Sequence, residues 1–292
     1  MRGEDRSFER EHQIQGFGDL IVRPNQRTIE TVFYSMIELL RTTYRRLKSI
    51  PLLVFGTITH VSTSKSAVAL TFDDGPDPVF TPRLLDILQQ HHAKATFFMV
   101  GQAAERHPDI VRKVAAAGHT IGNHSWDHPS FPLLTGRERR DQIRACAKTI
   151  APYAQHIFRP PYADQNLLSR LDALWLGYQV ITYNVTAVDW LDHGADWIKG
   201  RIMSRIQNGS IILFHDSLFR HGEDRYVDRE PMLNAVDTLL QELSGRFSFM
   251  TVPELLRQGR PQRRYWHKQT DIDFLNGLKG QYGDMRRYSK VG

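Results

Sequence analysis

The chain has 292 residues, of which 41 % are hydrophobic and 24 % charged; this composition excludes disordered, collagen-like and low-complexity proteins and leaves length for a large core. The formal net charge of +6 is unevenly spread: residues 1–65 carry +3, residues 66–256 carry −3 and residues 257–292 carry +6. Because a nucleic-acid groove needs a basic stripe, we expect no nucleic-acid partner for the middle of the chain.

Residues 1–65 are expected to form an extension built around one amphipathic helix. Apolar residues recur with a helical period over 29–47, and basic residues follow near the end of this stretch. The helix is expected to pack on the main domain or, alternatively, to lie on an anionic membrane surface. No secretory-type apolar run follows the charged first ten residues, and no segment reaches the ~20 apolar residues of a membrane span. We therefore expect a cytoplasmic protein without a transmembrane segment.

Residues 66–256 have the pattern of one α/β domain. Short β-rich runs alternate with helical stretches such as 81–91, 103–117 and 135–150, which is typical of a parallel sheet covered by helices. The expected strands are 67–72, 95–100, 120–123, 157–159, 178–183, 210–214 and 247–251. Seven strands favour an incomplete or distorted (β/α)7 barrel over a six-stranded open sheet.

Two adjacent carboxylates, Asp73 and Asp74, end the first expected strand. Parallel β/α folds place their active sites at the carboxyl ends of strands, and neighbouring side chains there point in different directions. One carboxylate can therefore bind a metal ion while the other moves protons. An ordinary Asp-Gly-Pro turn is the alternative interpretation.

The third expected strand is followed by His124 and His128, four residues apart. This spacing brings two imidazole rings to one side of a helical turn, close enough to share a cation. One aspartate and two histidines leave room for water and substrate, as catalytic metal sites do. A chance pair of histidines is the alternative.

Two further strand ends carry Arg159 and His215. The arginine is expected to hold a carboxylate in a bidentate contact, and the histidine to donate a proton. Each residue taken alone could be structural. Complementary groups at several strand ends favour a catalytic site.

Five motifs together resemble carbohydrate esterase family 4, the polysaccharide deacetylase or NodB-homology family. In the order of the family they are Thr-Phe-Asp-Asp-Gly-Pro at 71–76, His-Ser-Trp-Asp-His at 124–128, Arg-Pro-Pro-Tyr at 159–162, Val-Asp-Trp at 188–190 and Leu-Phe-His-Asp at 213–216. The resemblance covers residues 66–256 and neither end of the chain. It implies a distorted barrel of the NodB-homology type and a metal-dependent hydrolase that releases acetate from N-acetylated amino sugars.

The resemblance also implies roles for the polar residues. Asp73 is expected to be the catalytic base and His215 the general acid. Asp74, His124 and His128 are expected to bind a divalent metal ion, with Zn²⁺ as the first expectation and other divalent transition metals as alternatives.

The same resemblance implies how the substrate is surrounded. Arg159 is expected to orient the base, and Tyr162 to donate its peptide N–H to the oxyanion. Leu213 is expected to line the acetyl pocket and Trp190 to form the wall of the groove.

One residue departs from the motif pattern of the family. Thr186 stands where the fourth motif often has its first aspartate, whereas Asp189 is present. Either the pKa of His215 is less elevated than in the family, or Asp189 takes over the tuning of this acid.

The expected function is N-deacetylation of an amino sugar in an oligosaccharide, a polysaccharide or a lipid-linked glycan. The alternatives are a deformylase or another amidase on the same barrel, and a catalytically silent carbohydrate-binding protein. Residues 257–292 are expected to be a basic, partly ordered tail, and the two basic ends could touch an anionic membrane from the cytoplasmic side.

Overall fold

A computed structural model describes residue 35 and residues 56–280 of the chain. The helix expected over 29–47 falls outside the described residues, apart from Ser35, and so do residues 281–292 of the expected tail. Within the described ranges, no helix combines the length and the apolar character that crossing a bilayer requires.

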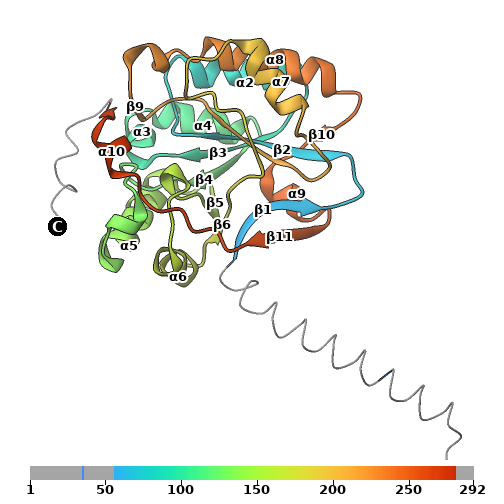
Figure 1. The fold of residues 1–292 in the computed structure, drawn as a ribbon. Helices are drawn as coiled ribbons and strands as arrows, with labels where there is room; N and C mark the ends of the chain where they lie inside the picture. The colour runs from blue at the N-terminus through green and yellow to red at the C-terminus, as the bar shows by residue number, and fades with distance from the viewer. Residues whose placement is uncertain (1–34, 36–55, 281–292) are drawn as a thin grey trace, which may run out of the picture. The chain divides into compact units, whose positions relative to one another are not determined.

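A curled parallel sheet forms the centre of the domain (Figure 1). Its strands lie in the order β6-β5-β4-β3-β2-β8-β7, and β10 pairs in parallel with β2. The strands are β2 (Ala67–Asp73), β3 (Ala95–Met99), β4 (Thr120–Asn123), β5 (Ala154–Phe158), β6 (Gln179–Val180), β7 (Val185–Thr186), β8 (Ile211–His215) and β10 (Ser248–Phe249). The expected distorted barrel of parallel strands is confirmed.

Two of the expected strands are much shorter than the sequence indicated. The stretch 178–183 keeps only β6, because Ile181 bridges to Ile58 and the Thr182 N–H donates to the Ile58 carbonyl. The stretch 247–251 keeps only β10, because Thr251 already caps the next helix. β7 was not expected, since a strand of two residues leaves no readable alternation.

Helices lie around the outside of the curled sheet, and those that follow neighbouring strands contact one another (Figure 1). They are α2 (Phe80–Gln90), α3 (Gly101–Arg106), α4 (Pro108–Ala116), α5 (Gly136–Ile150), α6 (Leu167–Trp175), α7 (Ala195–Met203), α8 (Glu230–Leu243) and α9 (Val252–Leu256), with 3₁₀ turns at Phe131–Leu133, Pro161–Ala163 and Asp224–Val227. The single helix expected over 103–117 is wrong. It is split into α3 and α4 at Pro108, which occupies a first-turn position where its missing N–H is tolerated.

The ends of the described chain also belong to the domain. β1 (Thr57–Ser62) pairs antiparallel with β11 (Arg260–Arg264), and beyond it lie α10 (Ile272–Asn276) and β12 (Lys279–Gly280). β12 pairs with β9 (Arg220–His221). Paired strands thus lie on the far side of both expected boundaries, at residues 66 and 256. The polar sequence of β11 carries no hydrophobic alternation that could have revealed it.

The core is centred on β2, whose seven residues are all buried. Phe72 stacks between Phe97 and Phe214, with ring centroids 5.3 and 5.6 Å apart. This aromatic layer lies one residue before Asp73, and therefore packing of the core fixes the position of the strand end that carries the two carboxylates.

Truncation of Phe72 should destabilise the domain strongly. Phe72→Ala removes a ring that is 0 % exposed, and we expect the free energy of unfolding to fall by roughly 3–5 kcal/mol in denaturant titrations. The control Ile272→Ala removes a side chain that is 57 % exposed and should change the value by less than about 0.5 kcal/mol. Equal losses for the two variants would contradict this account of the core.

Candidate active site

Side chains from the ends of four strands meet in one cavity of about 220 Å³. Of the residues singled out in the sequence, those that line it are Asp73, Asp74, His124, His128, Arg159, Tyr162, Trp190, Leu213 and His215. Asp189 lies behind this cavity and lines a smaller one. The strand ends therefore converge as the parallel topology predicted.

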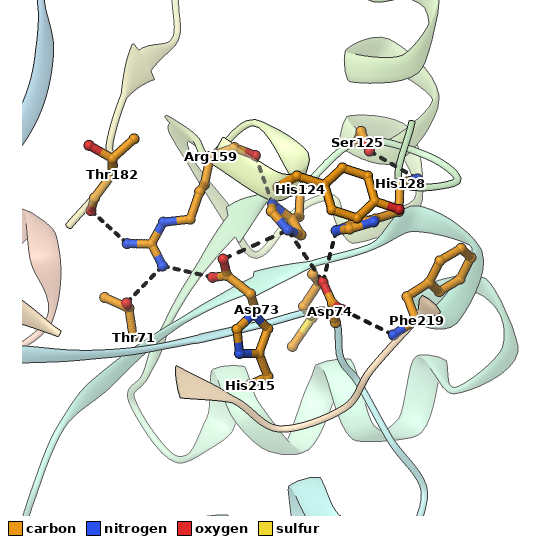
Figure 2. A network of polar contacts seen from close by, with 12 residues as sticks. Thr71, Asp73, Asp74, His124, Ser125, His128, Arg159, Thr182, His215 and Phe219 are labelled. Carbon is orange, nitrogen blue, oxygen red and sulfur yellow. Dashed lines mark hydrogen bonds and ion pairs between the residues drawn. The ribbon is translucent and has the colours of Figure 1, made fainter. Parts of the chain in front are cut away.

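Asp73 is held by Arg159, whose side chain is almost completely buried. Arg159 Nη1 lies 2.7 Å from Asp73 Oδ1 and also donates to Thr71 Oγ1 at 2.7 Å (Figure 2). Arg159 Nη2 donates to the Thr182 carbonyl at 2.9 Å. The contact to Asp73 is therefore made through one nitrogen, and the expected bidentate contact is wrong because main-chain carbonyls occupy the other donors. Asp73 Oδ2 is left free of Arg159 and lies 3.7 Å from His124 Nε2.

Asp74, His124 and His128 form a cluster of possible metal ligands, with ligand atoms all within 4.8 Å of one another. Asp74 Oδ1 lies 3.0 Å from His128 Nε2 and 3.4 Å from His124 Nε2. This buried oxygen has no hydrogen-bond partner among the described residues. Figure 2 shows both rings turned toward it. An oxygen of this kind needs a positive partner, since a buried polar atom without one is costly.

The protonation states suit a cation at this cluster. His124 Nδ1 lies 2.7 Å from the Arg159 carbonyl, which can only accept, so Nδ1 carries a proton and Nε2 is the nitrogen turned toward Asp74. Burial lowers the pKa of His128, although the charge of Asp74 opposes this. Burial alone would raise the pKa of Asp74, but His128 and His124 hold it well below its usual range. Neutral imidazoles and a carboxylate are the ligand forms that a divalent ion requires, so the residues fit one.

The backbone of the cluster is set in an uncommon conformation. Asp74, His128 and Tyr162 have positive φ angles of 77°, 61° and 56°. The Phe219 N–H donates to Asp74 Oδ2 at 3.1 Å, and the His128 N–H donates to Ser125 Oγ at 3.2 Å. Each left-handed residue costs on the order of 1 kcal/mol or more, and such residues persist where surrounding contacts fix them.

His215 is supported from behind by Asp189. The Asp189 carboxylate accepts from the His215 main-chain N–H at 2.8 Å and contacts its Nδ1 at 3.0 Å. Arg229 Nη1 in turn donates to the Asp189 carbonyl at 2.8 Å. Burial would lower the pKa of His215, but Asp189, followed by Asp74 and Asp73, raises it to about 9. His215 is therefore an imidazolium at neutral pH, poised to donate a proton.

With Thr186 in place of the first aspartate of the fourth motif, Asp189 is the carboxylate that contacts His215. The Thr186 hydroxyl accepts from the Val188 N–H at 3.3 Å and helps to shape the loop before Asp189. Asp189 itself contacts His215 and keeps its pKa high. Asp189 contacts His215 and does not line the larger cavity, so any effect that it has on chemistry there passes through His215.

Aromatic rings form two walls beside the polar groups. The Tyr162 ring stands edge-on to His128, with centroids 4.4 Å apart, and the Trp190 ring stands edge-on to His215 at 5.3 Å. Leu213 lines the cavity from β8 and is only 4 % exposed. The positions expected for the groove wall and the acetyl pocket thus face the same space as the polar residues.

Several contributors to the site carried no readable signal in the sequence. Phe219 acts through its peptide N–H, which no side-chain pattern reports. Arg229 lies thirteen residues beyond the last motif and resembles any other arginine before a helix. Lys268, Phe274 and Leu278 line the cavity from the segment that was expected to be a tail.

The support of His215 by Asp189 can be measured by NMR titration of the metal-free protein. We expect a His215 pKa of about 9 in the unaltered chain and a fall of more than about one unit in Asp189→Asn, because the carboxylate charge is lost. Asp192→Asn, which alters an exposed carboxylate nearby, should leave the value unchanged.

The same shift predicts how stability depends on pH. The folded-state pKa lies above the ordinary value of 6.5, so the stabilisation is complete below about pH 6.5 and is lost as the pH rises through 9. In Asp189→Asn, the free energy of unfolding should fall less as the pH rises from about 6.5 to 9. An unchanged pKa in that variant would contradict the assignment.

Comparisons with known proteins agree with this geometry. A family model described as polysaccharide deacetylase matches residues 60–181. A peptidoglycan-N-acetylglucosamine deacetylase of Bacillus cereus is 35 % identical over 206 residues, which cover 68 % of this chain and 72 % of that protein. A chitooligosaccharide deacetylase of Sinorhizobium fredii is 36 % identical over 168 residues, or 55 % of this chain and 76 % of that protein.

Solved structures show the same likeness. The Bc1960 peptidoglycan N-acetylglucosamine deacetylase aligns with a TM-score of 0.63 and 33 % identity, covering 70 % of this chain and 94 % of that one. A family 4 carbohydrate esterase from Streptomyces lividans, solved with acetate, aligns with a TM-score of 0.59 and 28 % identity, covering 71 % and 100 %.

Proposed function

The chain belongs to the polysaccharide deacetylase family, carbohydrate esterase family 4, and from this premise we propose that it hydrolyses the N-acetyl group of an amino sugar in a glycan. The products are acetate and a free amino sugar. Relatives named as peptidoglycan and chitooligosaccharide deacetylases support an N-acetylated oligosaccharide, polysaccharide or lipid-linked glycan as the substrate class.

One observation carries the proposal. A carboxylate fixed by a buried arginine, Asp73, and an imidazolium fixed by a buried carboxylate, His215, line the same cavity as the ligand cluster. A carboxylate paired with a guanidinium and an imidazole paired with a carboxylate are suited to act as base and acid. Amide hydrolysis needs both.

We propose Zn²⁺ as the ion held by Asp74, His124 and His128, because one carboxylate and two imidazoles are a common ligand set for it. When bound, such an ion polarises the acetyl carbonyl and lowers the pKa of a nearby water.

The chain's own residues then divide the reaction between them. Asp73, held in place by Arg159, accepts a proton from the water that attacks the acetyl carbon. The peptide N–H of Tyr162 is proposed to donate to the oxyanion, a contact whose loss typically costs about 3 kcal/mol of transition-state stabilisation. His215 gives its proton to the departing nitrogen, the C–N bond breaks, and acetate and the amine remain.

The proposal is tested by acetate release from N-acetylglucosamine oligomers, read together with the metal content of each protein. We expect Asp73→Asn to lose at least about 10³-fold in kcat while it keeps its metal, because Asp73 only moves a proton. His124→Ala should lose both metal and activity, because it removes a ligand. Asp192→Asn, at an exposed carboxylate outside the site, is the matched control.

Two results would favour another function. Acetate or formate release from simple amides but not from N-acetyl sugars would indicate a deformylase or another amidase on the same barrel. Tight binding of the oligomers with no acetate released by any preparation would indicate a carbohydrate-binding protein without catalysis.

Cytoplasmic location, with peripheral membrane contact through the basic ends, stays a proposal, and helix α6 offers a further surface for such contact. Its exposed residues are largely apolar; they are Leu167, Leu168, Leu171, Leu174 and Trp175. Arg140 and Arg144 lie over the Trp175 ring, with guanidinium carbons 5.1 and 5.8 Å from its centroid. Apolar side chains bordered by arginines suit the surface of an anionic bilayer.

Flotation with vesicles that contain phosphatidylglycerol tests this contact. Leu168→Ser combined with Trp175→Ser should reduce the bound fraction several-fold, because it removes the most exposed apolar side chains of α6. Trp197→Ser alters an exposed aromatic residue on α7 and serves as control. The proposal is lost if the double variant and the control float equally well.

A further inference from the structure

The segment at 265–280, here called the C-terminal strap, is firmly attached to the domain at its start. β11 immediately precedes it and pairs with β1 over the whole of both strands. Trp266 Nε1 then donates to the Ala163 carbonyl at 3.1 Å, and the Lys268 and Gln165 main chains exchange two hydrogen bonds of 3.3 Å. The strap therefore leaves the sheet edge and runs along the loop that follows β5.

The strap next contacts the wall of the cavity itself. Lys268 Nζ donates to the Tyr162 carbonyl at 2.8 Å and lies 3.3 Å from Asp164 Oδ1. Thr270 and Ser130 share a hydrogen bond of 2.6 Å. These contacts attach the strap to the residue whose ring packs on His128.

The far end of the strap is attached to β9, whose two residues also line the cavity. Asp271 caps helix α10, and Leu275 of this helix is buried. β12 then pairs antiparallel with β9, and Lys279 lies 3.4 Å from Asp224. In Figure 1 the red chain runs from β11, which lies next to β1, to α10, which lies near β9 and away from β1. The strap thus bridges the loop after β5 and the loop after β8.

Between these two attachments the strap faces the catalytic residues. Lys268, Phe274 and Leu278 line the same cavity as Asp73 and His215. The Phe274 ring stands edge-on to Tyr162, with centroids 6.3 Å apart. The cavity is partly open to solvent, and its volume of about 220 Å³ is below the roughly 300 Å³ at which pockets for drug-sized ligands begin, which suits a single amino sugar at the reacting position.

We propose that the C-terminal strap selects substrates whose reacting amino sugar is at a chain end, in short oligosaccharides, over internal residues of a long polymer. An internal residue needs open space for the glycan on both sides of the reacting sugar, and the strap fills one side between the loops after β5 and β8. The strap lies outside the residues that the family model matches, 60–181. This inference rests on the proposed N-deacetylase function.

The test compares kcat/KM for N-acetylglucosamine oligomers of one to six units with that for glycol chitin, a soluble polymer. We expect the full chain to prefer the short oligomers by at least tenfold. Phe274→Ala combined with Leu278→Ala should reduce that preference at least threefold, mainly through a lower KM for the polymer. Ile272→Ala, on the same helix but absent from the cavity lining, is the matched control.

A chain ending at residue 264 removes the strap and keeps β11; it should lose the preference, whereas a chain ending at residue 280 should keep it. If the shorter chain fails to fold, as judged by circular dichroism, the double variant decides. If the ratio of kcat/KM for the short oligomers to kcat/KM for glycol chitin is the same in the double variant and the full chain, the proposed role of the strap is overturned. Failure of every protein to release acetate from any substrate would overturn the proposed function, and the inference with it.

Discussion

The ion pair between Asp73 and Arg159 is the interaction on which the site depends. Arg159 is 1 % exposed, and a charge buried that deeply is tolerated only when all its donors are satisfied. Its side chain fixes the proposed base, while its carbonyl fixes the proton of His124 Nδ1. One residue thus orients both the base and a metal-ligand candidate. A shift of β5 relative to β2 would disturb both at once.

The second organising constraint is the layered support behind each reactive group. Asp189 sits behind His215, Arg229 behind Asp189, and the Phe219 N–H behind Asp74. These partners are buried, so water cannot replace them, and each restricts the side chain in front of it to one orientation. The left-handed backbone at Asp74 and His128 shows that geometry here takes precedence over local backbone preference.

Much of the fold and the chemical core of the site could be predicted from the sequence, because both are local. Asp73 and Asp74 directly follow a buried strand, and His124 and His128 follow another, so the parallel topology brings them together. What could not be predicted depends on long-range pairing. The polar residues of β11 pair with β1 some two hundred positions earlier, and Phe274 enters the cavity from a segment without periodicity. Neither leaves a pattern in a short window.

The pairing of β1 with β11 links the two ends of the domain. Thr57 lies opposite Arg264, one residue before the strap begins. Thr57 and Arg264 line no part of the catalytic cavity, yet their pairing holds the chain from which the strap departs. A substitution in β1 therefore acts on the root of the strap as well as on the strand in which it lies.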